Sequence, residues 1–336
     1  MKALVVRLSS IGDVVHTLPA LAALRRHGHT AGWLVEPAAL PLVWDNPALT
    51  YCGRVPSARG ISWKAARATW RQLRRQHFDV ALDFQGLWKS ALWARLAGAD
   101  RLLGFAPADR REAASAWLIR EQVTQPPGAV HVIDKNLALL RPLGIEALGL
   151  REFPLPPTAG EARSVAQGLA VLGISDFVIL NPGGGWANKQ WPTESFGSLA
   201  RRLRERGILP LVTFGPAEAA LADRVVRASL GSAVRGFGTT LLEFVELARR
   251  AKLLVSADTG PLHLACAVGT PVVGLYGPTD PARNGPFSPA DVVVRKTPPC
   301  APCHKRTCAT HDGIMKTIAV EEVVEAALTR LSRARG

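Results

Sequence analysis

A strand–turn–helix junction around residue 258 carries residue types that bind phosphate groups. The apolar run 253–256 is followed by the turn 257–261 and by a helical pattern that ends at Val268. Free backbone N–H groups and the positive end of the helix dipole attract anions at such a helix start. Thr259 adds a hydroxyl donor, while Asp258 and His263 add titratable groups. We expect a pyrophosphate site and a nucleotide-activated substrate; the alternative is that Asp258 or Thr259 only caps the helix.

A glycine-rich turn precedes this junction in the same half of the chain. Gly183, Gly184 and Gly185 let the backbone approach a ligand, and Lys189 supplies a compact positive charge that suits phosphate. The turn is not a Walker A loop, because no Gly-Lys-Ser/Thr occurs in it. Together the two turns predict a diphosphate site. Glu218 could accept hydrogen bonds from a ribose or an adenine, or could equally be a first-turn acid of a helix.

Asp13 follows the first predicted strand, after a turn that Gly12 permits. A carboxylate at the C-terminal end of a strand could act as a general base. The alternative is a helix-capping aspartate. No G-x-G-x-x-G follows this strand, which argues against a nicotinamide-dependent enzyme.

Apolar, β-rich runs alternate with helical patterns, which favours α/β domains with doubly wound parallel sheets. Predicted strands span residues 3–8, 32–35, 80–83, 177–181, 209–214, 253–256 and 272–276. Predicted helices span residues 17–26, 62–76, 88–97, 131–140, 162–172, 193–206, 218–229, 241–251, 261–268 and 320–332. Three prolines within 151–158 predict a connection between two domains, 1–155 and 156–336. Ligands would bind beyond the strand ends, in a cleft between the domains, towards which the last helix packs back.

The composition indicates a globular protein with anionic partners. The chain has 336 residues, of which 48% are hydrophobic and 20% are charged, and its formal net charge is +14. Such a charge favours nucleic acid, an anionic membrane surface or a phosphorylated substrate. Residues 59–75 hold six basic side chains and no acid, although a solvated helix face would look the same. The N-terminus reads as a strand rather than a signal peptide, which predicts a cytoplasmic protein.

The five cysteines fall into two groups. Cys52 and Cys266 lie in apolar surroundings, which is typical of buried thiols. Cys300, Cys303 and Cys308 form a C-x-x-C-x-x-x-x-C pattern that could hold zinc or iron if His304 or His311 supplied a fourth ligand.

Four motifs along the chain resemble those of the lipopolysaccharide heptosyltransferases, glycosyltransferase family 9. They span residues 9–19, 83–90, 258–263 and 276–281, in the family's order. The resemblance implies a GT-B fold of two Rossmann-like domains, with the acceptor on the first and the sugar nucleotide on the second. It implies ADP-L-glycero-D-manno-heptose as donor and a Kdo-bearing lipid A core as acceptor, and it implies no required cofactor and no nucleic-acid partner.

The resemblance also implies roles for single residues. Asp13 matches the catalytic base and Lys189 the lysine at the donor phosphates. Asp258, Thr259, Gly260 and His263 match the family's donor motif, and to these donor-binding residues we add Gly184 and Glu218 from the glycine turns described above. The acceptor-binding residues are Ser10, Gly12, Arg59, Lys64, Gln85 and Arg111. An enzyme with this acceptor would lie on the cytoplasmic face of the inner membrane as a peripheral protein.

Alternatives remain within and outside this family. Residues 63–65 and 83–90 resemble heptosyltransferase I, whereas the Cys300–Cys308 segment resembles heptosyltransferase II. In such segments a fourth cysteine often follows, but residues 313–316 stand in its place here, and we therefore predict no metal site. A related transferase with another donor or acceptor would carry the same motifs. A non-catalytic protein that binds anionic glycolipid or nucleic acid would explain the charge but not the glycine turns.

Overall fold

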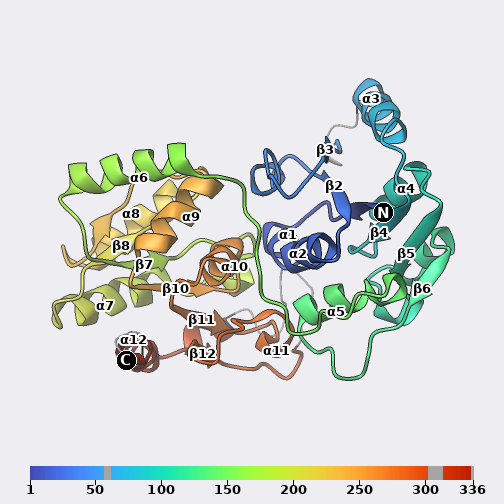
Figure 1. Ribbon diagram of the computed structural model, residues 1–336. Coiled ribbons are helices and arrows are strands. Elements are labelled where there is room, and N and C mark those ends of the chain that lie inside the picture. The colour runs from blue at the N-terminus through green and yellow to red at the C-terminus, as the bar shows by residue number, and fades with distance from the viewer. Residues whose placement is uncertain (57–61, 302–312, 334–336) are drawn as a thin grey trace. The chain divides into compact units, whose positions relative to one another are not determined.

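The computed structural model describes residues 1–56, 62–301 and 313–333. The chain divides into two compact units, residues 1–157 and 158–336, so the division falls two residues beyond the boundary predicted from the prolines. Each unit is built on a six-stranded sheet in which all pairs are parallel (Figure 1).

The sheet of the first unit has the order β3-β2-β1-β4-β5-β6. Its strands are β1 Lys2–Val6, β2 Thr30–Val35, β3 Tyr51–Arg54, β4 Val80–Asp83, β5 Arg101–Phe105 and β6 Glu121–Val123. Its helices are α1 Ile11–Val15, α2 Leu18–Arg26, α3 Trp63–Arg74, α4 Trp88–Leu96 and α5 Val132–Ala138, with short 3₁₀-helices η1 Leu40–Leu42, η2 Pro107–Asp109, η3 Ala113–Leu118 and η4 Arg141–Leu143.

The helices of this unit form two layers. Apolar residues of α3, α4 and the end of η3 pack with those of the sheet in one buried cluster. The chain moves along the sheet in one direction from β1 to β2 and in the opposite direction from β3 through β4 to β5. Right-handed crossovers therefore place α1 and α2 on the face opposite to α3 and α4. The central strand β1 is apolar and almost wholly buried, which is typical of a strand covered on both faces.

The second unit repeats this plan with the order β12-β11-β10-β7-β8-β9. Its strands are β7 Val178–Asn181, β8 Pro210–Val212, β9 Val234–Arg235, β10 Leu253–Ala257, β11 Val272–Tyr276 and β12 Val292–Arg295. Its helices are α6 Ala159–Leu172, α7 Thr193–Arg204, α8 Ala219–Ala228, α9 Leu241–Arg250, α10 Gly260–Ala267, α11 Pro281–Asn284 and α12 Val320–Arg333, with η5 Ala187–Lys189 and η6 Ile314–Thr317.

The last helix occurs where the sequence predicts it. The sequence places a helix at 320–332 and has it pack back towards a cleft. In the structure α12 packs on α7 and on the strands β10, β11 and β12. Val323 and Ala327 lie in the core of the second unit, and Arg330 forms a buried ion pair with Asp291 at 2.8 Å. The buried face of α12 is therefore a part of the second unit.

The predicted strands and helices all occur, with ends that differ by at most three residues. The strands that the sequence did not reveal are β3, β5, β6, β9 and β12. Four of these are edge strands, which are short and only partly buried, so their apolar signal is weak. In the described part of the chain, no helix is long and apolar enough to cross a bilayer.

Candidate active site

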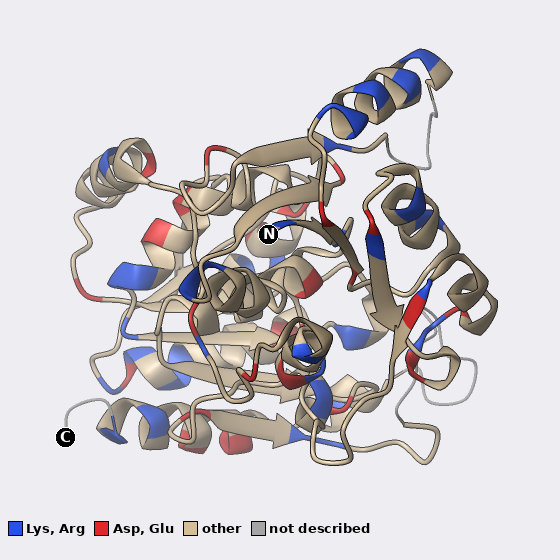
Figure 2. Ribbon diagram, turned by 45° about the vertical axis from the view of Figure 1, so that its right-hand side comes forward, with Lys and Arg blue, Asp and Glu red and all other residues tan. Residues whose placement is uncertain are grey.

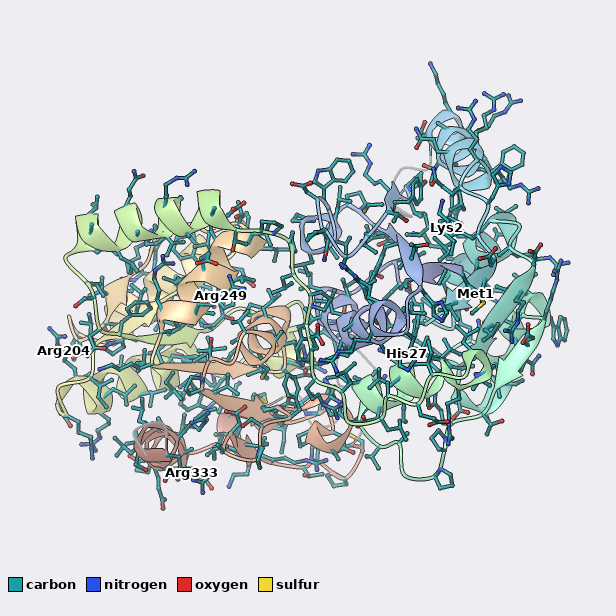
Figure 3. All side chains as sticks on the ribbon, viewed as in Figure 1. Met1, Lys2, His27, Arg204, Arg249 and Arg333 are labelled. Atoms are coloured by element: carbon teal, nitrogen blue, oxygen red, sulfur yellow. The ribbon has the colours of Figure 1, made fainter. Side chains whose placement is uncertain are left out.

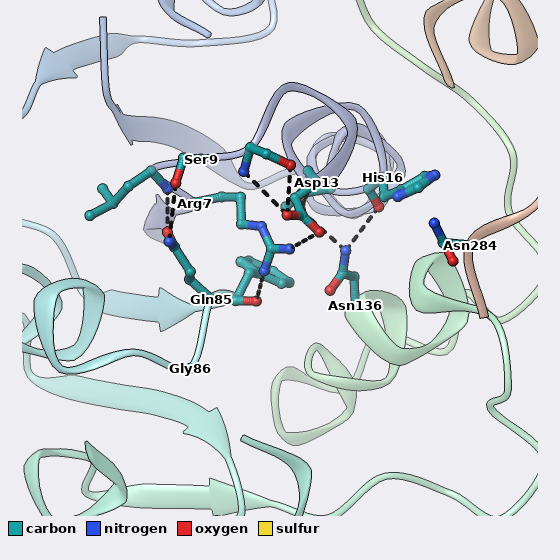
Figure 4. Close-up of polar contacts among 12 residues, drawn as sticks. Arg7, Ser9, Asp13, His16, Gln85, Gly86, Asn136 and Asn284 are labelled. Carbon is teal, nitrogen blue, oxygen red and sulfur yellow. Dashed lines mark hydrogen bonds and ion pairs between the residues drawn. The ribbon is translucent and has the colours of Figure 1, made fainter. Parts of the chain in front are cut away.

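Asp13 lies at the C-terminal edge of the first sheet, where the chain leaves β1 and turns into α1. It is the third residue of α1, and its Oδ2 accepts hydrogen bonds from Ser10 N at 3.2 Å and Ser10 Oγ at 2.9 Å (Figure 4). Asp13 therefore caps the start of α1, as one of the two predictions for this residue expects. Its side chain is nevertheless 35% exposed, so the carboxylate remains accessible to a substrate.

The second oxygen of Asp13 faces a buried arginine that sequence reasoning missed. Arg7 Nη2 lies 2.5 Å from Asp13 Oδ1, and Arg7 Nη1 donates to the carbonyl oxygen of Phe84 (Figure 4). Only 6% of Arg7 is exposed. The ion pair and the Ser10 contacts together fix the carboxylate in one orientation. The available signal was an arginine at the end of an otherwise apolar strand, since an unpaired charge is not tolerated there.

Gln85 joins this site from the loop that follows the neighbouring strand β4. Its Oε1 accepts from Leu8 N at 2.8 Å, and its Nε2 lies 3.4 Å from Ser9 Oγ. The structure thus brings Ser10, Gly12, Asp13 and Gln85 to one sheet edge, as the carboxyl ends of adjacent parallel strands predict. On the same edge the Lys89 ammonium pairs with Glu36, a contact that was not foreseen.

The remaining predicted acceptor residues are less constrained. Lys64 on α3 and Arg111 after η2 are both exposed. Arg59 lies outside the described residues. The roles of these three residues stay predictions.

A buried ion pair supports the loop that carries Gln85. Asp83 Oδ2 lies 2.5 Å from Arg110 Nη2, and both side chains are fully buried. Asp83 Oδ1 accepts from the backbone N–H groups of Gln85 and Gly86, at 3.1 and 3.3 Å. Gly86 has a φ of 71°, which favours glycine, so the tight turn is shaped by both its residue type and this carboxylate.

We expect Arg110→Met to lower the free energy of unfolding by about 3 to 5 kcal/mol, because it leaves the Asp83 carboxylate buried without its cation. The matched control is Arg111→Met, whose exposed side chain predicts a change within about 0.5 kcal/mol. Urea denaturation of both variants measures the difference. Equal stabilities would show that the buried pair does not hold this turn.

In the second unit, Asp258 gathers three donors at the C-terminal edge of β10. Its Oδ2 lies 2.6 Å from Lys189 Nζ, and its Oδ1 lies 3.1 Å from His263 Nε2 and 2.7 Å from Asn284 Nδ2. Burial alone would raise the pKa of the Asp258 carboxyl, but the hydrogen bond and charge of His263, together with Lys189, hold that pKa well below its usual range. Asp258 is therefore an anion that orients a lysine and a histidine.

Lys189 comes from the short helix η5 after the glycine-rich turn. Besides its contact with Asp258, its Nζ lies 4.7 Å from the centroid of the Trp186 ring, and its side chain is 16% exposed. The two turns that the sequence singled out thus meet through a single ion pair. The two turns also approach each other closely at Gly184, where an added Cβ would lie 3.2 Å from Thr259 Cγ2.

The start of α10 lacks a side-chain cap from its N-cap residue. Thr259 is the residue before the helix. Its hydroxyl lies 3.1 Å from Ser256 Oγ and accepts no hydrogen bond from a backbone N–H group of the first turn. Among the described residues no side chain caps α10. The alternative that Asp258 or Thr259 only caps this helix is therefore wrong.

Glu218 joins the glycine-rich turn to a second glycine turn. Its Oε1 accepts from Gly184 N at 3.0 Å, and its Oε2 accepts from Gly215 N at 3.1 Å. A Cβ on Gly183 would come within 2.3 Å of Glu218 Oε2, so a side chain at this position would displace the Glu218 carboxylate. Glu218 directly precedes α8, and it does more than a first-turn acid because it fixes the shape of both turns.

Of the two cysteines predicted to be buried, Cys266 is buried and Cys52 is half-buried. Burial raises the pKa of the Cys266 thiol well above its usual value and that of the half-buried Cys52 to about 11, so neither is a reactive thiolate. Cys300 is exposed, whereas Cys303 and Cys308 lie outside the described residues. The described part of the chain holds no group of three metal-ligating side chains, and the cysteine pattern at 300–308 is not tested.

Comparison with known proteins places this geometry in a family. Residues 66–313 match the sequence profile of Glycosyltransferase family 9 (heptosyltransferase). Lipopolysaccharide heptosyltransferase 1 of Pseudomonas aeruginosa is 31% identical, over 92% of this chain and 87% of its own length. Lipopolysaccharide heptosyltransferase 1 of Escherichia coli K12 is 30% identical, over 88% of this chain and 93% of its own.

The fold agrees with a solved heptosyltransferase. The structure of E. coli heptosyltransferase WaaC with ADP superposes with a TM-score of 0.75 at 23% identity, over 97% of this chain and 96% of that one. Two α/β units, each built on a parallel sheet, make up the GT-B fold that the sequence predicts. The chain belongs to glycosyltransferase family 9, the heptosyltransferases.

Proposed function

We propose that this heptosyltransferase transfers L-glycero-D-manno-heptose from ADP-heptose to the Kdo-lipid A inner core of lipopolysaccharide. The observation that carries the proposal is the pairing of Lys189 with Asp258 beside the uncapped start of α10, an arrangement suited to a diphosphate. The two relatives named above are lipopolysaccharide heptosyltransferases, and the similar WaaC structure contains ADP. The lipid-linked acceptor places the enzyme at the cytoplasmic face of the inner membrane as a peripheral protein.

In the proposed reaction Asp13 is the general base. An acceptor hydroxyl attacks the anomeric carbon of the heptose and forms the new carbon–oxygen bond, with inversion at that carbon. The hydroxyl proton passes to Asp13, and the bond between the anomeric carbon and the diphosphate breaks, so that its electron pair leaves with ADP. The arginine partner Arg7 and the Ser10 contacts orient the base, because they hold both carboxylate oxygens.

The second unit supplies the charge that the departing ADP needs. Negative charge builds on the diphosphate as the sugar bond breaks, and Lys189 and the N–H groups at the start of α10 stabilise that charge. Asp258 and His263 act behind Lys189: the carboxylate holds the ammonium and is itself held by the imidazole. Glu218 keeps the glycine turns in shape and borders the nucleoside. These groups do the work that a divalent cation does elsewhere, so the proposal includes no metal.

The test follows ADP release from ADP-heptose with and without Kdo2-lipid A, in the presence of EDTA. The proposal expects release that depends on the acceptor and is unchanged by the chelator. Release only with a core that already carries one heptose would move the assignment to heptosyltransferase II. No release with either acceptor would refute the proposed donor and acceptor, while the fold and the family would stand.

A further inference from the structure

One layer of the first unit has six large apolar side chains that are partly or largely exposed. They are Trp63 and Trp70 on α3, Trp88, Leu92 and Leu96 on α4, and Trp117 on η3, and we call them the aromatic face. Trp63 and Trp117 are 82% and 83% exposed, and the others are 38% to 48% exposed. A single exposed apolar residue needs no explanation, but six on one layer mark an interaction surface.

The three elements that carry the aromatic face lie on the same side of the sheet. Their inner residues share one buried cluster, and η3 packs directly on α4. The guanidinium of Arg74, at the end of α3, lies where a Cβ on Gly98 would be, just after α4. Trp88, Leu92 and Leu96 are each four residues apart, so they form one stripe along the outside of α4.

Positive charge accompanies these side chains. Helix α3 carries Lys64, Arg67, Arg71 and Arg74, and neither α3, α4 nor η3 contains an acidic residue. Figure 2 shows the blue of basic residues along α3 and no red of acidic ones, and Figure 3 shows side chains that end in nitrogen around that helix. Arginine and lysine beside tryptophan and leucine are typical of elements that lie in the interface of an anionic bilayer.

We propose that the aromatic face docks this enzyme on anionic phospholipid. The tryptophan and leucine side chains enter the boundary between headgroups and acyl chains, and the basic residues of α3 contact lipid phosphates. The observation that selects lipid over a protein partner is charge: α3 and α4 carry basic residues, η3 carries no charge, and none of the three contains an acid, which fits a surface of a single, negative sign. The inference extends the proposed function but does not require it, because binding to lipid needs no transfer.

The aromatic face begins where the proposed acceptor site ends. Trp88 starts α4 three residues after Gln85, and its backbone N–H donates to Glu112 Oε2 at 2.6 Å. The N–H of Glu112 donates in turn to the carbonyl oxygen of Gly86 at 3.2 Å. A lipid-anchored acceptor in the bound bilayer would therefore lie beside the sheet edge that carries Asp13.

Vesicle co-sedimentation of the full chain tests the docking. Vesicles of phosphatidylcholine with phosphatidylglycerol are expected to bind the protein, and those of phosphatidylcholine alone are expected to bind it far more weakly. Replacing Trp63 and Trp117 by Ser together should weaken binding about tenfold or more, because both rings are lost from the interface. Arg67→Gln and Arg71→Gln should each weaken it about fivefold, with less effect at high salt.

The matched control is Trp44→Ser. Trp44 is 58% exposed but belongs to a loop that Arg25 of α2 holds through the carbonyl of Pro47, on the opposite layer. We expect this variant to bind vesicles like the parent protein. All three tryptophans are exposed, so none of these changes removes core packing. The proposal would be overturned if Trp44→Ser weakened vesicle binding as much as the Trp63/Trp117 variant does, or if the parent protein bound neutral and anionic vesicles equally. It would also be overturned if the parent protein were a dimer that the Trp63/Trp117 substitutions dissociate.

Transfer assays separate docking from acceptor recognition. The Trp63/Trp117 variant should lose activity on acceptor embedded in vesicles and keep it on a water-soluble, delipidated Kdo acceptor. Loss on both acceptors would assign these residues to the acceptor site and refute the docking role. Vesicle binding without any transfer by the parent protein would refute the proposed function and leave the docking role standing.

Discussion

Asp13→Asn is expected to lower kcat about a hundredfold or more and to leave ADP binding unchanged. The amide keeps the shape of the carboxylate and can still accept from Ser10, but it cannot take the proton of the attacking hydroxyl. Acceptor-dependent ADP release measures kcat, and calorimetric titration with ADP measures binding, since the residues assigned to ADP belong to the second unit.

The control for this variant is Asp45→Asn, an exposed aspartate of the same unit. Its backbone φ of 55° is one that asparagine tolerates, so the change should leave both stability and kcat unaltered. Asp13→Glu adds a second comparison, because it keeps the charge opposite Arg7 while moving the carboxylate. Turnover of Asp13→Asn within a few-fold of the parent enzyme would remove Asp13 from the role of base.

Lys189→Met should lower kcat by about a hundredfold to a thousandfold, the usual effect of removing one group that stabilises charge in the transition state. The effect on the affinity for ADP-heptose should be smaller, because the extra charge on the diphosphate appears only as the sugar bond breaks. Steady-state kinetics that separate kcat from KM measure this difference. A change confined to KM would show that Lys189 binds the donor without acting in the chemical step.

Lys252→Met is the matched control in the same unit. Lys252 pairs with Asp176 on the surface, and its side chain is 50% exposed. Surface pairs of this kind contribute little to stability, so the variant should be as stable and as active as the parent protein. Asp258→Asn offers a further comparison: it leaves Lys189 in the chain but removes the carboxylate that orients it, and an intermediate loss of kcat is expected.

The sequence predicted the central parts of the fold and of the site, because both lie where the local signals are strong. Buried strands such as β1 and β10 read as apolar runs, and each meets its turn residues at the same sheet edge. The edge strands β3, β6, β9 and β12 were not predicted, because they are short and partly exposed. Helix α1 is a single turn and has no apolar period long enough to be recognised.

Pairing between turns and elements explains what else the sequence left hidden in the site. Asp13, Lys189 and Asp258 stand in recognisable turns, but the partners that fix them lie outside those turns: Arg7 directly after β1, and Asn284 in α11, 26 residues away from Asp258. The sequence predicts Glu218 as a donor-binding residue, but its hydrogen bonds to the two glycine turns depend on the neighbouring positions of β7 and β8 in the sheet. Such contacts follow from topology and have no local pattern.

The chain passes from the first unit to the second at Pro157, and α12 remains with the second sheet. Each unit is thus encoded by one uninterrupted stretch of gene and has its own hydrophobic core. A single recombination event between the codons for Pro157 and Thr158 would exchange one whole sheet with its helices and would cut no strand pair. Under the proposed roles, evolution can then change the acceptor half without rebuilding the residues that hold the diphosphate.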